Sequence, residues 1–519
     1  MIAARERGML VLAKVRSCAM TGLDGYEVEV EVDISNGLPA FDVVGLPDPS
    51  VKEARERVRS ALRNSGFKFP NSRITVNLAP ADIRKEGTWY DLPIALGVLA
   101  ASEQINAIFL DGLFAIGELA LDGNIRSVNG VLQMAVAAGN SRSGGVDLMV
   151  PAINAKEAAL VKSTRVIGAS TLFEAASHIS GLIDLRHPSV DMKEFISGEE
   201  KYDTDASDII GHETAKRALE IAAAGGHNVL LVGPPGSGKT MLARNIPSIL
   251  PRLTEKECLE VTKTFSLCGL LPPGEPLIRR RPFRSPHHTA SSASIIGGGK
   301  NPRPGEVTLA NHGVLFLDEF PEYQRNVLES LRQPLEDRIV TISRVAGVQT
   351  FPASFILVAA MNPCFCGERT NPNKICSCTP WQADRYMKKI SGPLLDRIDI
   401  QLDVPVLKYE DLTNTQKRET SAEVRVRVEK ARHVQQQRYG KEYTCNAEIR
   451  GRDLKKYCQL DQAGTKLLKK AFQTMGLSLR AHDRILRVAR TIADLAGLPH
   501  IQEDHLAEAI QYRSFENKG

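Results

Sequence analysis

A glycine-rich stretch at residues 233–241 has the residue types and spacing of a phosphate-binding loop. A glycine, four further residues and then Gly-Lys-Thr stand between an apolar run and a helix-like run. The glycines let backbone N–H groups curl around phosphate oxygens, and the first turn of the helix adds its positive end. The lysine of such a loop reaches the β and γ phosphates, and the hydroxyl that follows it ligates Mg²⁺. The predicted ATP-binding residues are Gly233, Pro234, Pro235, Gly236, Ser237, Gly238, Lys239, Thr240 and Met241.

Two acids after a second apolar run supply the other groups that hydrolysis needs. Asp318 and Glu319 directly follow the run 314–317. Asp318 can hold Mg²⁺ together with Thr240, and Glu319 can act as the general base that polarises the attacking water. An acidic pair after a strand is weakly diagnostic by itself. Combined with the phosphate loop, it predicts Mg²⁺-dependent ATP hydrolysis, with Lys239 and Glu319 as catalytic groups.

An α/β core must position these groups. The apolar runs at 227–232, 314–317 and 354–360 have the length and composition of buried strands, and helix-like runs separate them. The first of these strands leads directly into the phosphate loop. We therefore predict an α/β domain over residues 208–410.

The regions on either side of this core have different patterns. Residues 1–184 mix apolar and helix-like runs, which predicts an α+β domain. Residues 185–207 are polar, contain Pro188 and lack a sustained apolar period, as a linker does. Residues 411–519 have a helical pattern and predict a C-terminal helical domain. The expected fold class is therefore a multidomain α/β protein.

Composition restricts the class of protein. The chain is 43% hydrophobic and 24% charged, and it has no apolar run of 18 residues, which excludes a membrane protein. Lys14 and Arg16 interrupt the short apolar stretch near the N-terminus, so we expect no cleaved signal and a cytoplasmic protein. The formal net charge of +5 requires any nucleic-acid-binding surface to be local.

Four of the nine cysteines lie close together in the sequence. They form two C-x-C pairs with nine residues between them: Cys364 and Cys366, then Cys376 and Cys378. An odd number of cysteines in a long chain without a secretion signal argues against a disulfide framework. Two interpretations stay open, a structural Zn²⁺ site or four reduced loop thiols, since C-x-C is less usual than C-x-x-C.

The order of these motifs resembles that of AAA+ ATPases, and the resemblance gives Asn362 and Arg397 roles. Asn362 follows the strand 354–360 and would be sensor 1, binding the attacking water or the γ phosphate. The alternative is an Asn that caps a strand end. Arg397 would be an arginine finger for a neighbouring subunit's ATP, and the alternative is an Arg paired with Asp396 or Asp399. A finger would make the active form a ring or a filament.

The same resemblance points to an arginine in the C-terminal helical region as sensor 2. Arg480 lies at a predicted helix start in the expected lid, and Arg484 is its competitor one turn later. We take Arg480 as the candidate catalytic residue.

Several strings resemble one family closely, the ComM or YifB group of magnesium-chelatase-like AAA+ proteins. They are Ser-Pro-His-His-Thr at 285–289, three glycines at 297–299, Pro-Gly-Glu at 304–306, Ala-Met-Asn-Pro at 360–363 and Gly-Pro-Leu-Leu-Asp-Arg-Ile-Asp at 392–399, with further matches at 51–59 and 77–82. The resemblance implies a hexameric DNA motor that drives branch migration in homologous recombination and natural transformation. Implied partners are single-stranded and branched DNA, further copies of the chain, a recombinase and other recombination proteins.

Two basic loops could be the parts that such a motor uses on DNA. About 60 residues separate the helix after the phosphate loop from the acidic pair, far more than an ordinary crossover. This excess resembles the helix-2 insertion of magnesium chelatases and contains Lys300 and Arg303. A hairpin pattern at 339–351 puts Arg344 near its tip. Each of these residues can contact phosphates, and each can equally be a solvated loop charge.

The N-terminal domain resembles the proteolytic domain of Lon through residues 84–91 and 117–126. Trp89 stands where that domain has its nucleophilic serine, and without an activated hydroxyl there is no acyl-enzyme route. We therefore expect a Lon-like fold without peptidase activity, which disfavours an ATP-dependent protease. The main alternative function is a protein-remodelling or chelatase-type ATPase that does not act on DNA.

Overall fold

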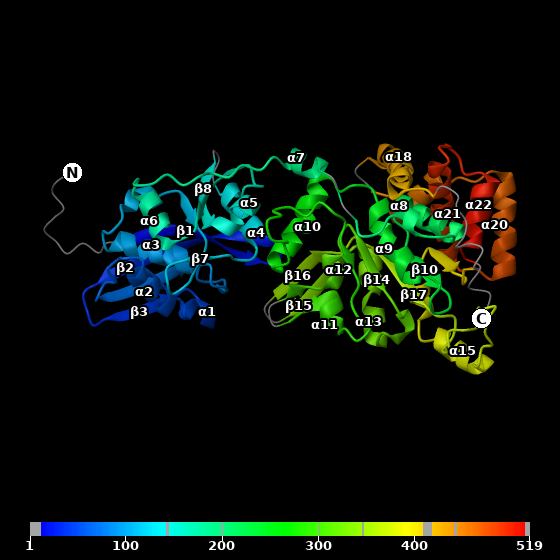
Figure 1. Ribbon diagram of the computed structural model, residues 1–519, viewed down its shortest axis with the longest axis horizontal. Coiled ribbons are helices and arrows are strands. Elements are labelled where there is room, and N and C mark those ends of the chain that lie inside the picture. The colour runs from blue at the N-terminus through cyan, green and yellow to red at the C-terminus, as the bar shows by residue number, and fades with distance from the viewer. Residues whose placement is uncertain are drawn as a thin grey trace. The chain divides into compact units, whose positions relative to one another are not determined.

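The computed structural model describes residues 12–141, 145–198, 200, 202–299, 302–344, 347–407, 418–440 and 444–513. They form two compact units (Figure 1). Unit 1 is Met1–Gly198 with Glu255–Ile278, and unit 2 is Glu199–Thr254 with Arg279–Gly519. The part of the expected linker up to residue 198 thus folds with unit 1. So does the segment 255–278, which we placed in the 208–410 domain. The expected boundary at 410 lies outside the described residues.

Unit 1 is built on a seven-stranded mixed sheet in the order β3-β4-β2-β1-β5-β8-β9. The centre of the sheet is antiparallel, and β5, β8 and β9 continue it as parallel strands. A two-stranded ribbon of β6 and β7 lies beside it. The strand bounds are Ala13–Thr21 (β1), Asp24–Ser35 (β2), Ala40–Val44 (β3), Arg73–Ala79 (β4), Leu113–Ala115 (β5), Glu118–Leu119 (β6), Ile125–Arg126 (β7), Val146–Pro151 (β8) and Thr164–Ala169 (β9).

Helices cover this sheet. Every residue of α3 is buried, as expected of a helix that is apolar on all sides. Helix α10 joins the unit from a distant part of the sequence: the side-chain amide of Gln133 donates to the backbone oxygen of Lys263 at 2.8 Å, and Ser266 bonds Glu157. The helices are α1 (Pro49–Lys52), α2 (Ala54–Asn64), α3 (Asp91–Ala101), α4 (Val131–Asn140), α5 (Ala155–Ala158), α6 (Leu172–Ile179), α7 (Met192–Ser197) and α10 (Glu255–Leu267).

Unit 2 contains a five-stranded sheet in the order β11-β14-β17-β10-β18, and all of its strands are parallel. Strands β10, β14 and β17 are buried along their whole length, as strands covered on both faces are. The bounds are Val229–Val232 (β10), Phe283–Arg284 (β11), Val314–Leu317 (β14), Ile356–Met361 (β17) and Ile400–Asp403 (β18). The expected α/β class is confirmed, while the Lon-like and lid assignments stay predictions.

Helices and two hairpins surround the sheet of unit 2. Two antiparallel hairpins, β12 (Gly297–Gly298) with β13 (Arg303–Pro304) and β15 (Ile339–Arg344) with β16 (Gly347–Pro352), project from it. The helices of the core are α8 (Glu213–Gly225), α9 (Lys239–Ile249), α11 (Ser292–Ile296), α12 (Glu306–Leu309), α13 (Arg325–Ser330), α14 (Arg332–Asp337), α15 (Pro380–Met387) and α16 (Gly392–Leu395).

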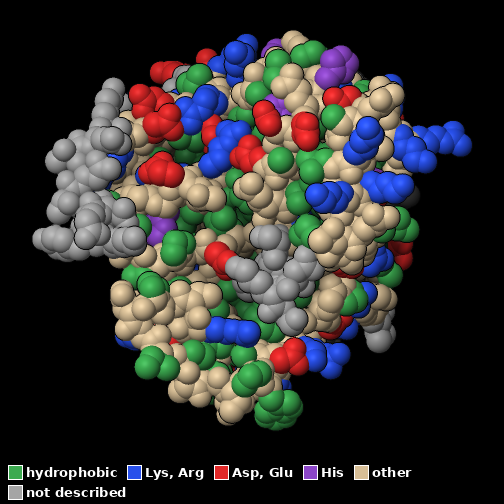
Figure 2. Space-filling model, turned by 90° about the vertical axis from the view of Figure 1, so that its right-hand side faces the viewer, with side chains coloured by type: hydrophobic (Ala, Val, Ile, Leu, Met, Phe, Trp, Pro, Cys, Tyr) green, Lys and Arg blue, Asp and Glu red, His purple; other side chains and the backbone are tan. Residues whose placement is uncertain are grey.

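The C-terminal region is helical and packs on the core of unit 2. Its helices share one hydrophobic cluster with β10 and α8, and the buried His227 ring bonds the Thr491 hydroxyl at 2.8 Å. On the face of unit 2 that carries α20 and α22, basic and acidic side chains are mixed (Figure 2). The helices are α18 (Ser421–Tyr439), α19 (Gly451–Tyr457), α20 (Gln462–Met475), α21 (Leu479–Leu495) and α22 (Glu503–Gln511). Among the described residues, no helix combines the length and apolarity that a membrane span needs.

Candidate ATP-hydrolysis site

The phosphate loop joins the carboxyl end of β10 to the first turn of α9. Gly236 and Gly238 have φ values of 76° and 83°, a region that only glycine adopts readily. A Cβ on Gly233 would come within 2.2 Å of the Val404 backbone oxygen, so the start of the loop also requires glycine. These constraints turn the loop back over its own strand and direct its N–H groups to one place.

Lys239 is the first residue of α9, and its side chain turns back to the start of the loop. Its Nζ donates to the backbone oxygens of Gly233 and Pro234 at 2.7 and 2.9 Å, and to Oδ1 of Asn362 at 3.3 Å. Burial lowers the pKa of Lys239. The fold thus brings the predicted sensor asparagine, at the end of β17, next to the predicted phosphate-binding lysine on α9.

The residues predicted to hold Mg²⁺ also meet. The Thr240 hydroxyl donates to Oδ2 of Asp318 at 3.0 Å, across the first turn of α9 and the end of β14. A hydroxyl and a carboxylate side by side suit Mg²⁺, which takes oxygen ligands and keeps several waters when it binds nucleotide phosphates. Thr240 and Asp318 would therefore hold the ion beside the phosphates.

Glu319 has a partner that the sequence did not indicate. Its backbone is left-handed at φ 52°, and its Oε2 lies 2.9 Å from Nδ1 of His288. The ring of His288 lies tilted against that of His287, with 4.1 Å between centroids, and meets the ring of Tyr323 edge-on. Tyr323 in turn donates its hydroxyl to the Pro286 backbone oxygen at 2.6 Å. The Ser-Pro-His-His-Thr string therefore positions the predicted general base.

Replacing His288 with alanine is expected to lower kcat for ATP about tenfold with little change in KM, because a general base that loses its orientation is misaligned with the attacking water. Steady-state ATPase assays would measure this. Thr289→Ala is the matched control, since it removes a hydroxyl that bonds the His287 ring at 2.9 Å and leaves His288 in place. Equal rates for His288→Ala and wild type would contradict a positioning role.

The predicted arginine finger, Arg397, is buried in the single subunit. Its side chain is 5% exposed, forms an ion pair with Glu336 at 2.6 Å and donates to the Pro393 backbone oxygen at 2.6 Å. Its acidic partner is therefore neither Asp396 nor Asp399. Glu336 itself is 47% exposed, so the pair lies close to the surface of the unit.

The two candidates for sensor 2 differ in accessibility. Arg484 bonds the buried Asp399, and although burial opposes it, Arg484 and His227 hold the pKa of Asp399 far below its ordinary value. Arg480 is 58% exposed, and Asp396 lies 3.9 Å away from it. Arg480 is therefore the residue that can reach outward from this subunit.

Both candidates lie at the opposite end of the sheet from the phosphate loop. They line one pocket with Asn228, which precedes β10, and with Asp399, which precedes β18. The phosphate loop follows the other end of β10, four residues later, and strands rise about 3.3 Å per residue. Arg480 is therefore not placed to contact nucleotide bound by its own subunit.

The two basic loops lie side by side, as Figure 1 also shows for β15, β16 and α11. A Cβ on Gly297 would be 2.9 Å from the Ile342 side chain, and one on Gly298 would be 3.5 Å from the Arg344 guanidinium. Arg303 and Arg344 are exposed on these hairpins. Lys300 lies outside the described residues. Two further arginines of the insertion, Arg281 and Arg284, make internal contacts, Arg284 with Glu306 at 2.6 Å.

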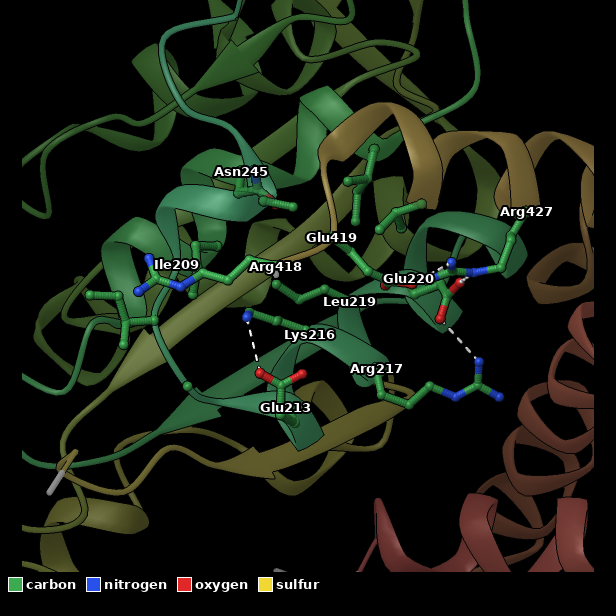
Figure 3. A pocket seen from close by; sticks show the side chains of 15 residues that line it. Ile209, Glu213, Lys216, Arg217, Leu219, Glu220, Asn245, Arg418, Glu419 and Arg427 are labelled. Carbon is green, nitrogen blue, oxygen red and sulfur yellow. Dashed lines mark hydrogen bonds and ion pairs between the residues drawn. The ribbon is translucent and has the colours of Figure 1, made fainter. Parts of the chain in front are cut away.

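A pocket of about 420 Å³ lies along α8, and no sequence motif indicates it (Figure 3). It lies between α8, α9 and the start of α18, and its wall is partly apolar, with Ile209, Leu219, Ile249 and Val424. Around it, Lys216 pairs with Glu213 at 3.1 Å, and Glu220 pairs with Arg217 and Arg427. His212 lies between the lining residues Gly211 and Glu213, and its Nε2 would be 3.6 Å from a Cβ on Gly238. One side of the pocket is therefore close to the phosphate loop.

Trp89, which we expect at the position of the Lon serine, makes structural contacts. Its indole N–H donates to the Cys18 backbone oxygen at 3.0 Å, and its ring fills the space beside Gly87. Neither contact supplies a nucleophile.

The four clustered cysteines also converge. Their sulfur atoms all lie within 4.8 Å of one another, so this loop could hold a metal ion.

Known protein families and individual proteins match this chain over most of its length. Three family models match: "Magnesium chelatase, subunit ChlI" over residues 205–412, "Subunit ChlI of Mg-chelatase" over 30–154 and "Magnesium chelatase, subunit ChlI C-terminal" over 418–513. Competence protein ComM of Haemophilus influenzae is 46% identical over 508 residues, and the match covers 97% of each chain. YifB of Salmonella typhimurium is 44% identical with the same coverage.

A more distant relative matches part of the chain. The DNA replication licensing factor Mcm2 of Drosophila melanogaster is 25% identical over 209 residues, which are 38% of this chain and 20% of that protein. The matches to ComM and YifB extend over nearly the whole chain. The chain therefore belongs to the ComM and YifB family of magnesium-chelatase-like AAA+ proteins.

Proposed function

We propose that this chain is an ATP-driven motor that works as a hexameric ring on branched or single-stranded DNA. The observation that carries the proposal is the pair of adjacent basic hairpins, with Arg303 and Arg344 exposed, on the unit that holds the ATP site. Basic side chains at hairpin tips are suited to the phosphate backbone, which gives sequence-independent binding. The names of two relatives, a competence protein and a DNA replication licensing factor, point in the same direction.

ATP hydrolysis in this proposal uses residues of two subunits. Lys239 binds the β and γ phosphates, Thr240 and Asp318 hold Mg²⁺, and Asn362 and Glu319 orient the attacking water. Arg397 and Arg480 of the neighbouring subunit then stabilise the charge that develops on the phosphates. Arg480 lines the pocket at the opposite end of the sheet, and the Arg397 backbone oxygen accepts from the side chain of Asn228 at that end, at 3.1 Å, which supports this division of roles.

The adenosine part of ATP has a matching pocket. We propose that it extends from Gly238 past His212 into the pocket lined by Ile209 and Val424. That pocket is concave, as small-molecule sites are, and it combines an apolar wall with many polar and charged side chains, among them Asn245.

Hydrolysis can reach the hairpins through short segments of the chain. Strand β16 ends four residues before β17, which carries Asn362 at its end, and the segment with His288 leads into α11 and the β12–β13 hairpin. A movement of either Asn362 or His288 on phosphate release would therefore shift a basic hairpin. We propose this as the coupling between ATP turnover and DNA movement.

The biological setting that we propose is cytoplasmic homologous recombination, including the integration of DNA taken up in natural transformation. A recombinase and other recombination proteins are the partners expected there. The competence name of the ComM relative supports this setting.

The test is the ATPase rate with and without a synthetic branched DNA, with branch movement followed in the same reaction. We expect DNA to stimulate turnover, and we expect ATP-dependent branch movement. Arg344→Ala should reduce the stimulation while the basal rate stays close to that of wild type. Lys388→Ala, on an exposed lysine that follows the last residue of α15 and pairs with Asp384, is the matched charge control. ATP turnover that is indifferent to every DNA would instead favour a protein-remodelling motor.

A further inference from the structure

The loop between β17 and α15 brings four thiols into one small space. The sulfur atoms of Cys364, Cys366 and Cys376 lie 3.5–3.6 Å from one another, and that of Cys378 completes a group that spans at most 4.8 Å. A disulfide would require about 2.05 Å between two of the sulfur atoms, so these are four separate thiols.

These separations match a single tetrahedral ion. With metal–sulfur bonds of about 2.3 Å, as Zn²⁺ makes with thiolates, the edges of a regular tetrahedron measure about 3.8 Å. An iron–sulfur cluster with several irons would hold its thiolates further apart than this. Tetrahedral coordination by four sulfurs is the usual geometry of structural Zn²⁺.

The backbone around the thiols has the features of a metal-binding turn. The N–H of Gly367 donates to the Cys364 backbone oxygen at 3.0 Å, and the N–H of Cys366 donates to the Cys378 sulfur at 3.3 Å. An N–H group that donates to a thiolate, as that of Cys366 does, stabilises the thiolate and orients it toward an ion. Glu368 braces the connection between the two cysteine pairs through Lys374, at 2.9 Å.

The loop has little else that would hold it in place. Residues 365–379 contain no helix or strand, and their two large apolar side chains, Phe365 and Ile375, are 75% and 96% exposed. A segment that buries so little apolar surface needs a cross-link or a metal to keep one conformation.

The loop lies next to the candidate ATP site, so a metal that orders the loop can affect nucleotide binding. Cys364 follows Asn362 by two residues. Gly367, at φ 81°, faces the phosphate loop so closely that a Cβ there would be 2.7 Å from Cδ of Pro235 and 3.7 Å from Cγ of Asn362. The turn formed by the first two cysteines therefore packs on both the phosphate loop and the predicted sensor.

We infer that Cys364, Cys366, Cys376 and Cys378 bind one Zn²⁺, and that the loop it orders clamps Pro235 and Asn362 in the arrangement that binds ATP. The role of the clamp rests on the proposed ATP site, whereas the presence of the metal does not. The two parts are tested separately.

The first test is elemental analysis of the full-length protein purified without chelator. We expect about one zinc per chain, consistent with the four-thiolate stoichiometry of structural sites. Cys376→Ser and Cys378→Ser should each lose the metal, and Cys268→Ser, on a cysteine of unit 1 outside the cluster, should keep it. Wild-type protein that contains no zinc, or variants that keep it, would overturn the metal site.

The second test separates the clamp from the metal. Gly367→Ala keeps all four thiols but forces a methyl group against Pro235. We expect it to keep its zinc and to bind a fluorescent ATP analogue about tenfold more weakly, as displacement of positioning groups by an ångström or less can do. Gly274→Ala is the control, because the backbone there has the same left-handed φ of 81° but a Cβ meets no atom within 4 Å. Unchanged nucleotide affinity in Gly367→Ala that retains zinc would overturn the clamp.

Discussion

Replacing Glu319 with glutamine is expected to abolish ATP hydrolysis while ATP still binds. Glutamine keeps the size and hydrogen-bonding capacity of the side chain but cannot accept a proton from the attacking water. Loss of a general base typically costs about 10²–10⁴-fold in rate. We expect Lys239, Thr240 and Asp318 to bind the phosphates and Mg²⁺ with their own side chains, and the bond from the Glu319 backbone N–H to Oδ1 of Asp318, at 2.9 Å, is kept in this variant. The measurements are kcat under saturating ATP and the affinity for a fluorescent ATP analogue.

A neighbouring glutamate provides the control for this variant. Glu322 lies three residues further along, in the short helical turn Phe320–Glu322, and pairs with Lys389 at 2.9 Å. Glu322→Gln removes the same charge from the same segment and should retain nearly the wild-type rate. If Glu319→Gln retained most of its activity, the general base would have to be sought among other groups near Asn362.

Local patterns were enough to predict the phosphate loop, the acidic pair and the strands that carry them. Each of these features depends on residues that are adjacent in sequence: Gly238 needs its left-handed backbone, and Lys239 must begin the next helix. The α/β class of unit 2 follows from the same runs, because strands buried on both faces have a continuous apolar sequence. The proximity of Lys239 to Asn362 could be expected only through the resemblance to AAA+ proteins.

Contacts between distant segments could not be predicted from such patterns. The His288 ring meets Glu319 across 31 positions of the chain, and no periodicity links the two residues. Helix α10 was assigned to the 208–410 domain because it lies within that range. It folds with unit 1 because Ser266 and the Lys263 backbone satisfy buried polar groups on Glu157 and Gln133. Pairing of buried polar groups therefore decided its place, and this was invisible in the hydrophobic pattern.

The ion-pair partner of Arg397 also could not be predicted from the sequence. The two acids beside it in the chain, Asp396 and Asp399, were its natural candidates for an ion pair. Asp399 is instead taken by Arg484 and by the backbone N–H of Asn228, at 2.9 Å. Arg397 turns to Glu336 on α14. The sequence could name the residue but not the partner that holds it in an isolated subunit.

Arg397→Ala is expected to lower ATP turnover by about 10³-fold or more while nucleotide binding is retained, because an arginine finger acts on the transition state and not on the ground state. Arg397→Lys should be almost as inactive, since an ammonium group keeps the charge but lacks the planar fork of donors. The measurement that distinguishes a finger from a structural ion pair is a mixture of two inactive variants. Lys239→Ala lacks a working phosphate loop but can supply Arg397, and Arg397→Ala has the opposite defect. Mixed rings should recover turnover at interfaces where the two intact parts meet.

Glu336→Gln completes this test. In the single subunit Glu336 holds Arg397 at 2.6 Å, so a finger must leave this partner before it can reach a neighbour's phosphates. Removing the carboxylate should then leave turnover unchanged or raise it. If Arg397 served only the ion pair, Glu336→Gln and Arg397→Ala would cause the same loss of thermal stability, and mixing would restore nothing. Recovery in mixed rings, with Glu336→Gln fully active, would mean that Arg397 pairs with Glu336 in the isolated subunit. On assembly, Arg397 would then leave Glu336 and contact the ATP of the neighbouring subunit.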